Sequence, residues 1–101
     1  MSEAASTRTP LCIPATHPSL PGHFPGQPVV PGVVILDAVQ RAIEAASGEL
    51  PALKLPQVKF MQQLLPGEDA LIEIDATATG RWRFRVLRGD TLIASGEIAV
   101  A

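Results

Sequence analysis

The feature that most constrains this chain is the density of proline in its first third. Six of the ten prolines fall at positions 14, 18, 21, 25, 28 and 31. Each proline fixes its own φ and lacks a backbone N–H, so neither a helix nor a central strand survives this spacing. The sequence therefore predicts a stiff, ordered loop over residues 14–31, with regular structure on either side of it.

A helix is predicted directly after this loop. Residues 33–46 contain no proline or glycine, and Ser47-Gly48 provides a signal for the helix end. The polar residues form one stripe at spacing i, i+3, i+4, i+7, made of Asp37, Gln40, Arg41 and Glu44. Since the other positions are almost all apolar, we expect the helix to be buried on most sides against a sheet.

The remaining segments predict strands. A short strand is expected over residues 11–16, and four more over residues 54–63, 71–79, 81–87 and 91–100. The alternation is sharpest where Trp82, Phe84 and Val86 interleave with Arg81, Arg83 and Arg85. This order of elements is typical of an α+β domain in which a single helix packs on an antiparallel sheet.

Length and composition narrow the class of protein. A chain of 101 residues suits one domain, which we expect at residues 9–101, with residues 1–8 disordered. Hydrophobic residues make up 47%, which indicates that some apolar surface lies in an oligomer interface. The net charge of −2 does not favour nucleic acid or a membrane surface as a partner.

The absence of a membrane span and of a signal peptide in the sequence indicates a cytoplasmic protein. No apolar run reaches the ~18 residues of a membrane span, and residues 1–10 lack the apolar core of a signal peptide. The single cysteine, Cys12, cannot form a disulfide within the chain and is expected to be a small buried hydrophobic residue.

The proline loop and the helix start together carry a motif. His23-Phe24-Pro25-Gly26 is followed by Pro28, Pro31-Gly32-Val33 and Asp37-Ala38. The pattern, HFPG-x-P-x-x-PG with an acid fourteen residues after the histidine, resembles the 3-hydroxyacyl-[acyl-carrier-protein] dehydratases. Two later stretches match that family more weakly, Val58-Lys59-Phe60 and Leu65-Pro66-Gly67-Glu68. The resemblance implies the hotdog fold, in which an antiparallel sheet of about five strands wraps one long central helix.

The resemblance also implies a role for each residue of the motif. His23 would be the base that takes a proton from C2 of the substrate, since imidazole titrates near neutral pH. Asp37 would be the acid that protonates the departing hydroxyl group. The backbone N–H groups of Gly32 and Val33 would bind the thioester oxygen. Candidate walls of the substrate tunnel are Phe24, Phe60, Met61 and Trp82.

The partners follow from the same resemblance. It implies a homodimer with two sites at its interface, each built from both subunits, and it leaves larger assemblies open. The substrate would be carried on the phosphopantetheine of acyl carrier protein, and no metal ion or other cofactor is expected. Because carrier proteins are acidic, basic side chains are candidates for docking. These candidates are Arg41, Arg81, Arg83 and Arg85.

Two positions depart from the family pattern and keep alternatives open. Asp37 stands where the most common branch has glutamate, and Arg41 stands where the family has glutamine, with Gln40 one position earlier. Asp37 could instead belong to a solvated stripe, paired with Arg41 at i,i+4. The arginine row could likewise be a solvated strand face, and Trp82 a core residue.

Three functions are therefore compared. The first is a dehydratase that removes water from (3R)-3-hydroxyacyl thioesters on acyl carrier protein, in fatty-acid or polyketide/aryl-polyene-type biosynthesis. The second is a non-catalytic hotdog that binds acyl carriers, or a partner subunit that completes another enzyme's site. The third, ranked last, is an acyl thioesterase.

Overall fold

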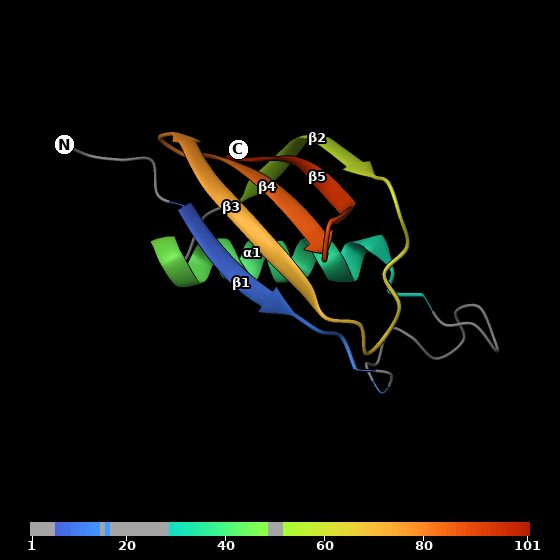
Figure 1. The fold of residues 1–101 in the computed structure, drawn as a ribbon. Helices are drawn as coiled ribbons and strands as arrows, with labels where there is room; N and C mark the ends of the chain where they lie inside the picture. The colour runs from blue at the N-terminus through green and yellow to red at the C-terminus, as the bar shows by residue number, and fades with distance from the viewer. Residues whose placement is uncertain (1–5, 15, 17–28, 49–51) are drawn as a thin grey trace.

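The structure is a computed structural model that describes residues 6–14, 16, 29–48 and 52–101. Within these residues the chain forms one helix and five strands (Figure 1). Their bounds are β1 Ser6–Leu11, α1 Gly32–Ser47, β2 Leu53–Phe60, β3 Ala70–Ala78, β4 Arg81–Arg88 and β5 Thr91–Val100. The predicted α+β class, with one helix on an antiparallel sheet, is confirmed for the described part of the chain.

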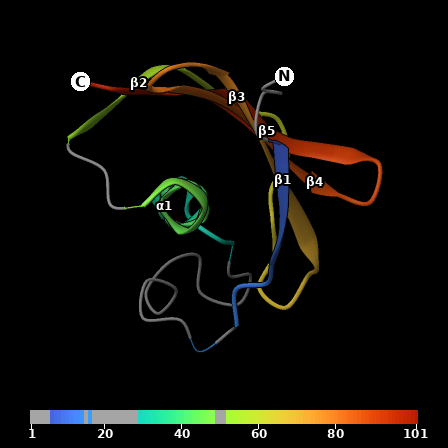
Figure 2. The same ribbon diagram turned by 90° about the vertical axis from the view of Figure 1, so that its left-hand side faces the viewer.

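The described strands form a single sheet in the order β1-β3-β4-β5-β2, and all neighbours are antiparallel. β3, β4 and β5 form a meander, with Gly80 and Gly89 at the two turns. Both glycines have positive φ, which other residues adopt only with strain. Figure 2 shows the sheet curving around α1. No helix of the described residues is long and apolar enough to cross a membrane.

The contact between α1 and the inner face of the sheet forms the core. The buried helix positions are Val34, Ile35, Val39, Ala42 and Ile43. On the sheet, Phe84 is fully buried in the same cluster. Burying one large apolar side chain contributes roughly 1.5–3 kcal/mol, so this cluster fixes the helix on the sheet. The predicted polar stripe is exposed at Asp37, Gln40 and Arg41, and half-buried at Glu44.

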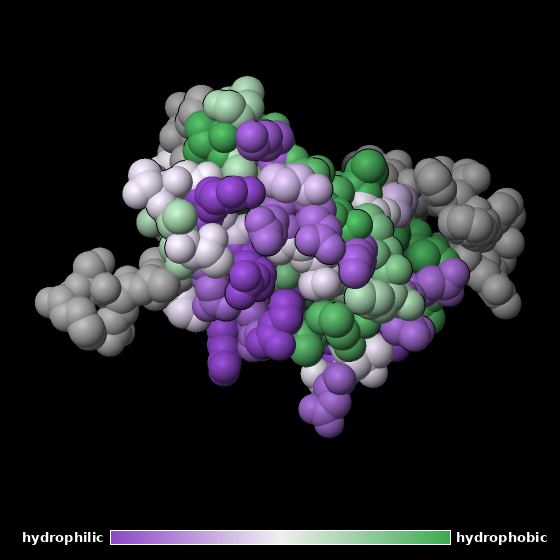
Figure 3. Space-filling view, turned by 90° about the horizontal axis from the view of Figure 1, so that it is seen from above, coloured by the Kyte–Doolittle hydropathy of each residue, from purple (hydrophilic) through white to green (hydrophobic). Residues whose placement is uncertain are grey.

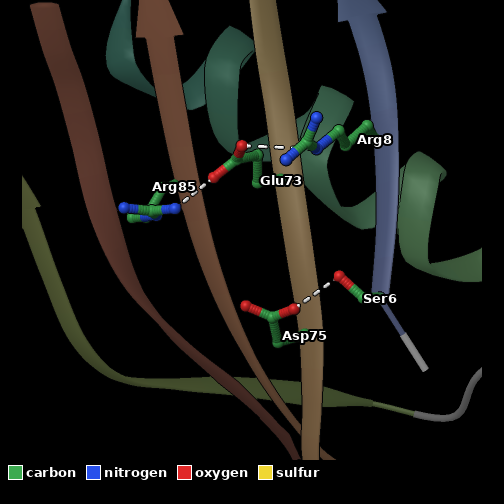
Figure 4. A network of polar contacts seen from close by, with 5 residues as sticks. All are labelled: Ser6, Arg8, Glu73, Asp75 and Arg85. Atoms are coloured by element: carbon green, nitrogen blue, oxygen red, sulfur yellow. Dashed lines mark hydrogen bonds and ion pairs between the residues drawn. The ribbon is translucent and has the colours of Figure 1, made fainter. Parts of the chain in front are cut away.

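The first strand differs from the prediction. The sequence predicts a strand over residues 11–16 and disorder over residues 1–8, whereas β1 spans Ser6–Leu11. The predicted strand starts too late and includes residues 12–14, which lie beyond β1, and residues 6–8 of the segment predicted to be disordered belong to β1. Contacts across the sheet hold these residues on β3 (Figure 4). The Ser6 hydroxyl donates to Asp75 Oδ1 at 2.7 Å, and Arg8 Nε lies 3.5 Å from Glu73 Oε2.

Two smaller differences concern single residues. β2 ends at Phe60 rather than at residue 63, because the N–H groups of Met61 and Gln62 both donate to the carbonyl oxygen of Ile93. Cys12 is exposed, so its predicted burial is wrong. It follows Leu11 at the end of the strand, where the inward-facing position is already taken by that leucine.

Gly96 allows β2 to approach β5 closely. A Cβ atom at this position would lie 2.3 Å from the carbonyl oxygen of Gln57 and 3.0 Å from the Phe84 ring. The register of β2 on β5 also shifts between Lys54 and Gln57, where two residues of β2 face one of β5. Glycine is therefore required here because of crowding by neighbouring backbone, not because of its φ.

We expect Gly96→Ala to lower the free energy of unfolding by about 1–3 kcal/mol, since the methyl group would force β2 away from β5. Urea denaturation of the purified protein measures this change. Ser95→Ala, at the neighbouring position, is the control and should change stability by less than about 0.5 kcal/mol. Equal stability of Gly96→Ala and the wild type would show that β2 is not held this tightly.

Candidate functional site

The predicted site residues fall into two groups in the structure. His23 and Phe24 lie outside the described residues. Gly32, Val33 and Asp37 lie along the first turns of α1. The cavities that adjoin these turns give the local geometry of the candidate site.

The start of α1 presents backbone N–H groups. Pro31 is the N-cap residue, in an extended conformation and with no side-chain cap. The N–H of Val34 donates to the carbonyl oxygen of Pro31 at 3.0 Å. Among the described residues, no acceptor is found for the N–H groups of Gly32 and Val33. Such N–H groups, with the helix dipole behind them, favour an oxygen that carries negative charge.

A pocket of about 430 Å³ opens beside this helix start, and we call it the apolar pocket. Its lining is Val29, Val30, Gly32, Val33, Ile35, Leu36, Phe60, Gln62, Gln63 and Leu64. The tip of the Phe60 ring points at Gly32: a Cβ atom there would lie 2.8 Å from Phe60 Cζ. A ligand bound at the helix N–H groups would therefore also contact apolar side chains.

Asp37 lies on a second cavity, a groove of about 310 Å³ between α1 and β2. The groove is lined by Val33, Leu36, Asp37, Gln40, Leu53, Leu55 and Ile98. The Asp37 carboxylate (Oδ2) lies 3.0 Å from Arg41 Nε, and 58% of the Asp37 side chain is exposed. The i,i+4 pair considered from the sequence is therefore present.

The two cavities adjoin each other along one flank of α1. Val33 and Leu36 line both of them. Val33 and Asp37, four residues apart, lie on this flank of the helix, and Gly32 precedes Val33 at the helix start. The structure brings together the N–H donors and the carboxylate that the sequence singles out.

Two of the candidate tunnel residues lie elsewhere. Trp82 is 9% exposed and belongs to the hydrophobic core. This agrees with the alternative prediction that Trp82 is a core residue rather than a wall of the tunnel. Met61 is half exposed and lines a third cavity of about 580 Å³, which we call the polar pocket. Its lining is Phe60, Met61, Gln62, Gln63, Leu65, Glu68 and Arg88. Phe60 therefore lies between the apolar pocket and the polar pocket.

The candidate docking arginines of β4 lie on the outer face of the sheet. Arg81 Nη2 lies 3.5 Å from Glu97, and Arg85 pairs with Glu73 (Figure 4). Arg83 faces Asp75 and Glu97 across the sheet, yet it forms no ion pair within the described residues. Seen from above the sheet, hydrophilic side chains gather over much of this face (Figure 3). Glutamate side chains thus compensate the charges of Arg81 and Arg85. Arg83 is therefore the arginine of this row that we keep as the candidate for docking.

Arg88, which follows the arginine row of β4, makes contacts with the loop after β2 that the sequence does not predict. Its Nη1 donates to the carbonyl oxygen of Gln63 at 2.8 Å and to Glu68 Oε1 at 3.0 Å. Glu68 Oε1 also accepts the N–H of Leu65 at 2.8 Å. Arg88 therefore ties the loop after β2 to the β4–β5 turn. The only sequence signal for this contact is the matching turn at residues 65–68.

The described residues contain no group of His, Cys, Asp or Glu side chains that could hold a metal ion. The polar groups that line the two cavities along α1 are backbone N–H donors, amides and one carboxylate. These groups suit a ligand with a polarised oxygen and an apolar body.

Comparison with known proteins identifies the family. Residues 1–97 match the ApeI-like family model, described as ApeI dehydratase. The 3-hydroxyacyl-[acyl-carrier-protein] dehydratase FabZ of Desulforamulus reducens is 30% identical over 88% of this chain and 71% of its own length. The corresponding enzyme of Natranaerobius thermophilus is 32% identical over the same shares.

Solved structures agree with the predicted hotdog fold. The dehydratase heterocomplex ApeI:P from Xenorhabdus doucetiae superposes with a TM-score of 0.81 and 28% identity, over 97% of this chain and 88% of that chain. The fluoroacetyl-CoA thioesterase FlK superposes with a TM-score of 0.70 at 17% identity, over 100% of this chain and 88% of that chain. The FlK match shows the shared fold alone. The match to the family model over nearly the whole chain, together with the FabZ relatives, shows that this protein is a dehydratase of the ApeI-like family.

Proposed function

We propose that this dehydratase removes water from a 3-hydroxyacyl chain carried on the phosphopantetheine of acyl carrier protein. His23 takes the proton from C2, and the C3–O bond breaks as the C2–C3 double bond forms. Asp37 supplies the proton with which the hydroxyl group leaves as water. The N–H groups of Gly32 and Val33 stabilise the negative charge that develops on the thioester oxygen.

The observation that carries this proposal is the flank of α1. The N–H groups of Gly32 and Val33, which have no acceptor among the described residues, adjoin an apolar pocket, and the Asp37 carboxylate, five residues after Gly32, lies on the adjoining groove. A 3-hydroxyacyl thioester offers a carbonyl oxygen, an apolar chain and a leaving hydroxyl group. These three features match the donors, the pocket and the carboxylate in kind.

The reaction would take place at the interface of a homodimer. β2 is an edge strand that pairs only with β5 within the described residues. Beside this edge, Val33 is 72% exposed and Leu55 is 47% exposed. A second copy that pairs along β2 would cover this apolar surface and enclose the groove that holds Asp37.

A second candidate function is a partner subunit in a complex of two different chains. The Asp37–Arg41 pair favours it, since a carboxylate that already binds an arginine of its own helix is less free to contact a substrate hydroxyl group. The heterocomplex ApeI:P is a precedent for such an assembly in a structural neighbour. In that case the chain would contribute its pocket and N–H groups to a site whose acid and base come from the other chain.

The first prediction from the proposal concerns catalysis. The purified protein should add water to a trans-2-enoyl chain on acyl carrier protein, because elimination is reversible. His23→Ala and Asp37→Asn should each lower the rate by about 10²-fold or more. Mass spectrometry of the carrier-bound chain measures the product. Full activity of His23→Ala would contradict the mechanism, and loss with His23→Ala alone would remove Asp37 from it.

The second prediction concerns the dimer. Leu55→Arg should weaken self-association by about tenfold or more, because it places a charge in an apolar interface. Analytical ultracentrifugation measures the dissociation constant. Thr77→Arg is the matched control, since Thr77 is exposed on β3 away from the β2 edge. An unchanged dimer in the Leu55→Arg variant would rule out pairing along β2.

The third prediction concerns docking. Arg83→Glu should raise the KM for a substrate on acyl carrier protein about three- to tenfold, through loss of charge attraction. The same variant should leave the KM for the substrate on free pantetheine unchanged, because that substrate lacks the acidic protein. If the KM for both substrates stays at the wild-type value, the arginine row is a solvated strand face.

A further inference from the structure

The space around Gly32, rather than its backbone conformation, requires a glycine at the start of α1. Its φ lies outside the positive range that glycine adopts more readily than other residues. A Cβ atom at this position would lie 2.8 Å from Cζ of Phe60 and 3.2 Å from each of its two Cε atoms. Outside the adjoining part of the chain, these are the three nearest atoms. The tip of the Phe60 ring therefore occupies the space that a side chain at position 32 would need.

The backbone that carries this ring is fixed on the sheet. Phe60 pairs with Ala94 of β5, and the N–H of Met61 donates to the carbonyl oxygen of Ile93 at 2.8 Å. Ile93 and Ala94 are both fully buried. About half of Phe60 is exposed, so its ring does not fill the core. The ring instead reaches from the end of β2 to Gly32 and connects the sheet to the helix start.

The first turn of α1 has little local support. Pro31 provides no side-chain cap, and the first turn contains no acidic residue. Val34 and Ile35 are buried and anchor the positions that follow. The Phe60 ring is the contact that reaches Gly32 itself. The position of the first N–H groups of the helix therefore depends on this ring.

We infer that Phe60 is a positioning residue for the thioester: its ring packs on Gly32 and holds the first N–H groups of α1 in place. This inference rests on the proposed function, in which the N–H groups of Gly32 and Val33 bind the thioester oxygen. Phe60, Gly32 and Val33 line the same apolar pocket, so a thioester bound at these groups lies beside the ring. The ring limits the directions from which the thioester reaches the N–H groups. Accurate placement matters because a displacement of about 1 Å can lower a rate by about 10²-fold.

Two substitutions remove this contact from its opposite sides. Phe60→Leu deletes the three ring atoms that face Gly32 and keeps the side-chain atoms nearer the backbone. Gly32→Ala keeps the N–H group and adds a methyl group that displaces the ring tip. Each variant should lower the kcat for hydration of a trans-2-enoyl pantetheine thioester by about tenfold and change the KM by less than about twofold. Phe60→Val replaces Phe60→Leu if circular dichroism shows that the leucine variant is unfolded.

The double variant tests whether the two residues act through one contact. Because that contact can be lost only once, its kcat should be close to that of the worse single variant. A loss equal to the product of the two single losses, about 10²-fold, would overturn the inference. Leu65→Ala is the matched control, since Leu65 is similarly exposed in the loop after β2 but does not line the apolar pocket. It should leave the effect of Gly32→Ala unchanged, and coupling as strong as that of Phe60→Leu would also overturn the inference.

Infrared spectroscopy of a bound ligand measures the placement of the thioester without turnover. The ligand is a saturated acyl pantetheine thioester with ¹³C in its carbonyl group, which has no 3-hydroxyl group to lose. On binding to the wild-type protein, the carbonyl band should move to lower wavenumber as the N–H groups polarise it. The movement should be smaller in Phe60→Leu, whereas a purely structural role of the ring would leave it unchanged.

The two readouts separate this inference from the proposed function. If the carbonyl band responds to Phe60→Leu but no enoyl chain is hydrated, the proposed catalytic function is wrong and the positioning role stands. If chains are hydrated and neither the band nor the kcat responds to Phe60→Leu, the positioning role is wrong and the catalytic function stands. A carbonyl band that does not move on binding to the wild type would overturn the role of the N–H groups and this inference with it.

Discussion

The packing of α1 against the curved sheet is the interaction on which the other features of this protein depend. The helix buries one apolar face against a cluster that includes Phe84 and Ile93, both fully buried. At roughly 1.5–3 kcal/mol for each large side chain, this contact exceeds anything that the surface ion pairs supply. It fixes the rotation of the helix about its own axis. That rotation decides which helix positions meet the sheet and which line the cavities beside it.

The same packing leaves apolar surface uncovered in a single chain. Val33 and Leu55 remain exposed next to the β2 edge, while the polar stripe of α1 continues past them. An edge strand with unpaired backbone groups and adjacent apolar side chains is a natural site for a second subunit. Part of the high hydrophobic content of the chain is therefore exposed at the β2 edge, beside the proposed catalytic groups.

The sequence predicts the elements well where local rules govern them. Residues 33–46 read as a helix because proline and glycine are absent, and the structure extends this helix by one residue at each end. Local rules do not predict β1, because its position depends on pairing with β3 some 60 residues later in the chain, with Ser6 opposite Asp75. The contact of Phe60 with Gly32 has the same character: neither residue's neighbours in sequence indicate it. The motif identifies Gly32 and Asp37, whereas the shape of the cavities beside them can be described only from the folded structure.

Asp37 and Arg41 are the two positions that depart from the family pattern, and the strength of their ion pair bears on whether Asp37 can act as the acid. Both side chains are more than half exposed. An i,i+4 ion pair on a helix surface contributes only about 0.3–0.5 kcal/mol, and salt screens it further. Breaking it costs less than one hydrogen bond from a bound substrate returns. The carboxylate can therefore leave Arg41 when a hydroxyl group arrives, provided that the groove is closed to water by a partner. The arginine shifts this balance without forbidding the proposed acid role, so we expect closure of the proposed interface to matter more for Asp37 than the identity of residue 41.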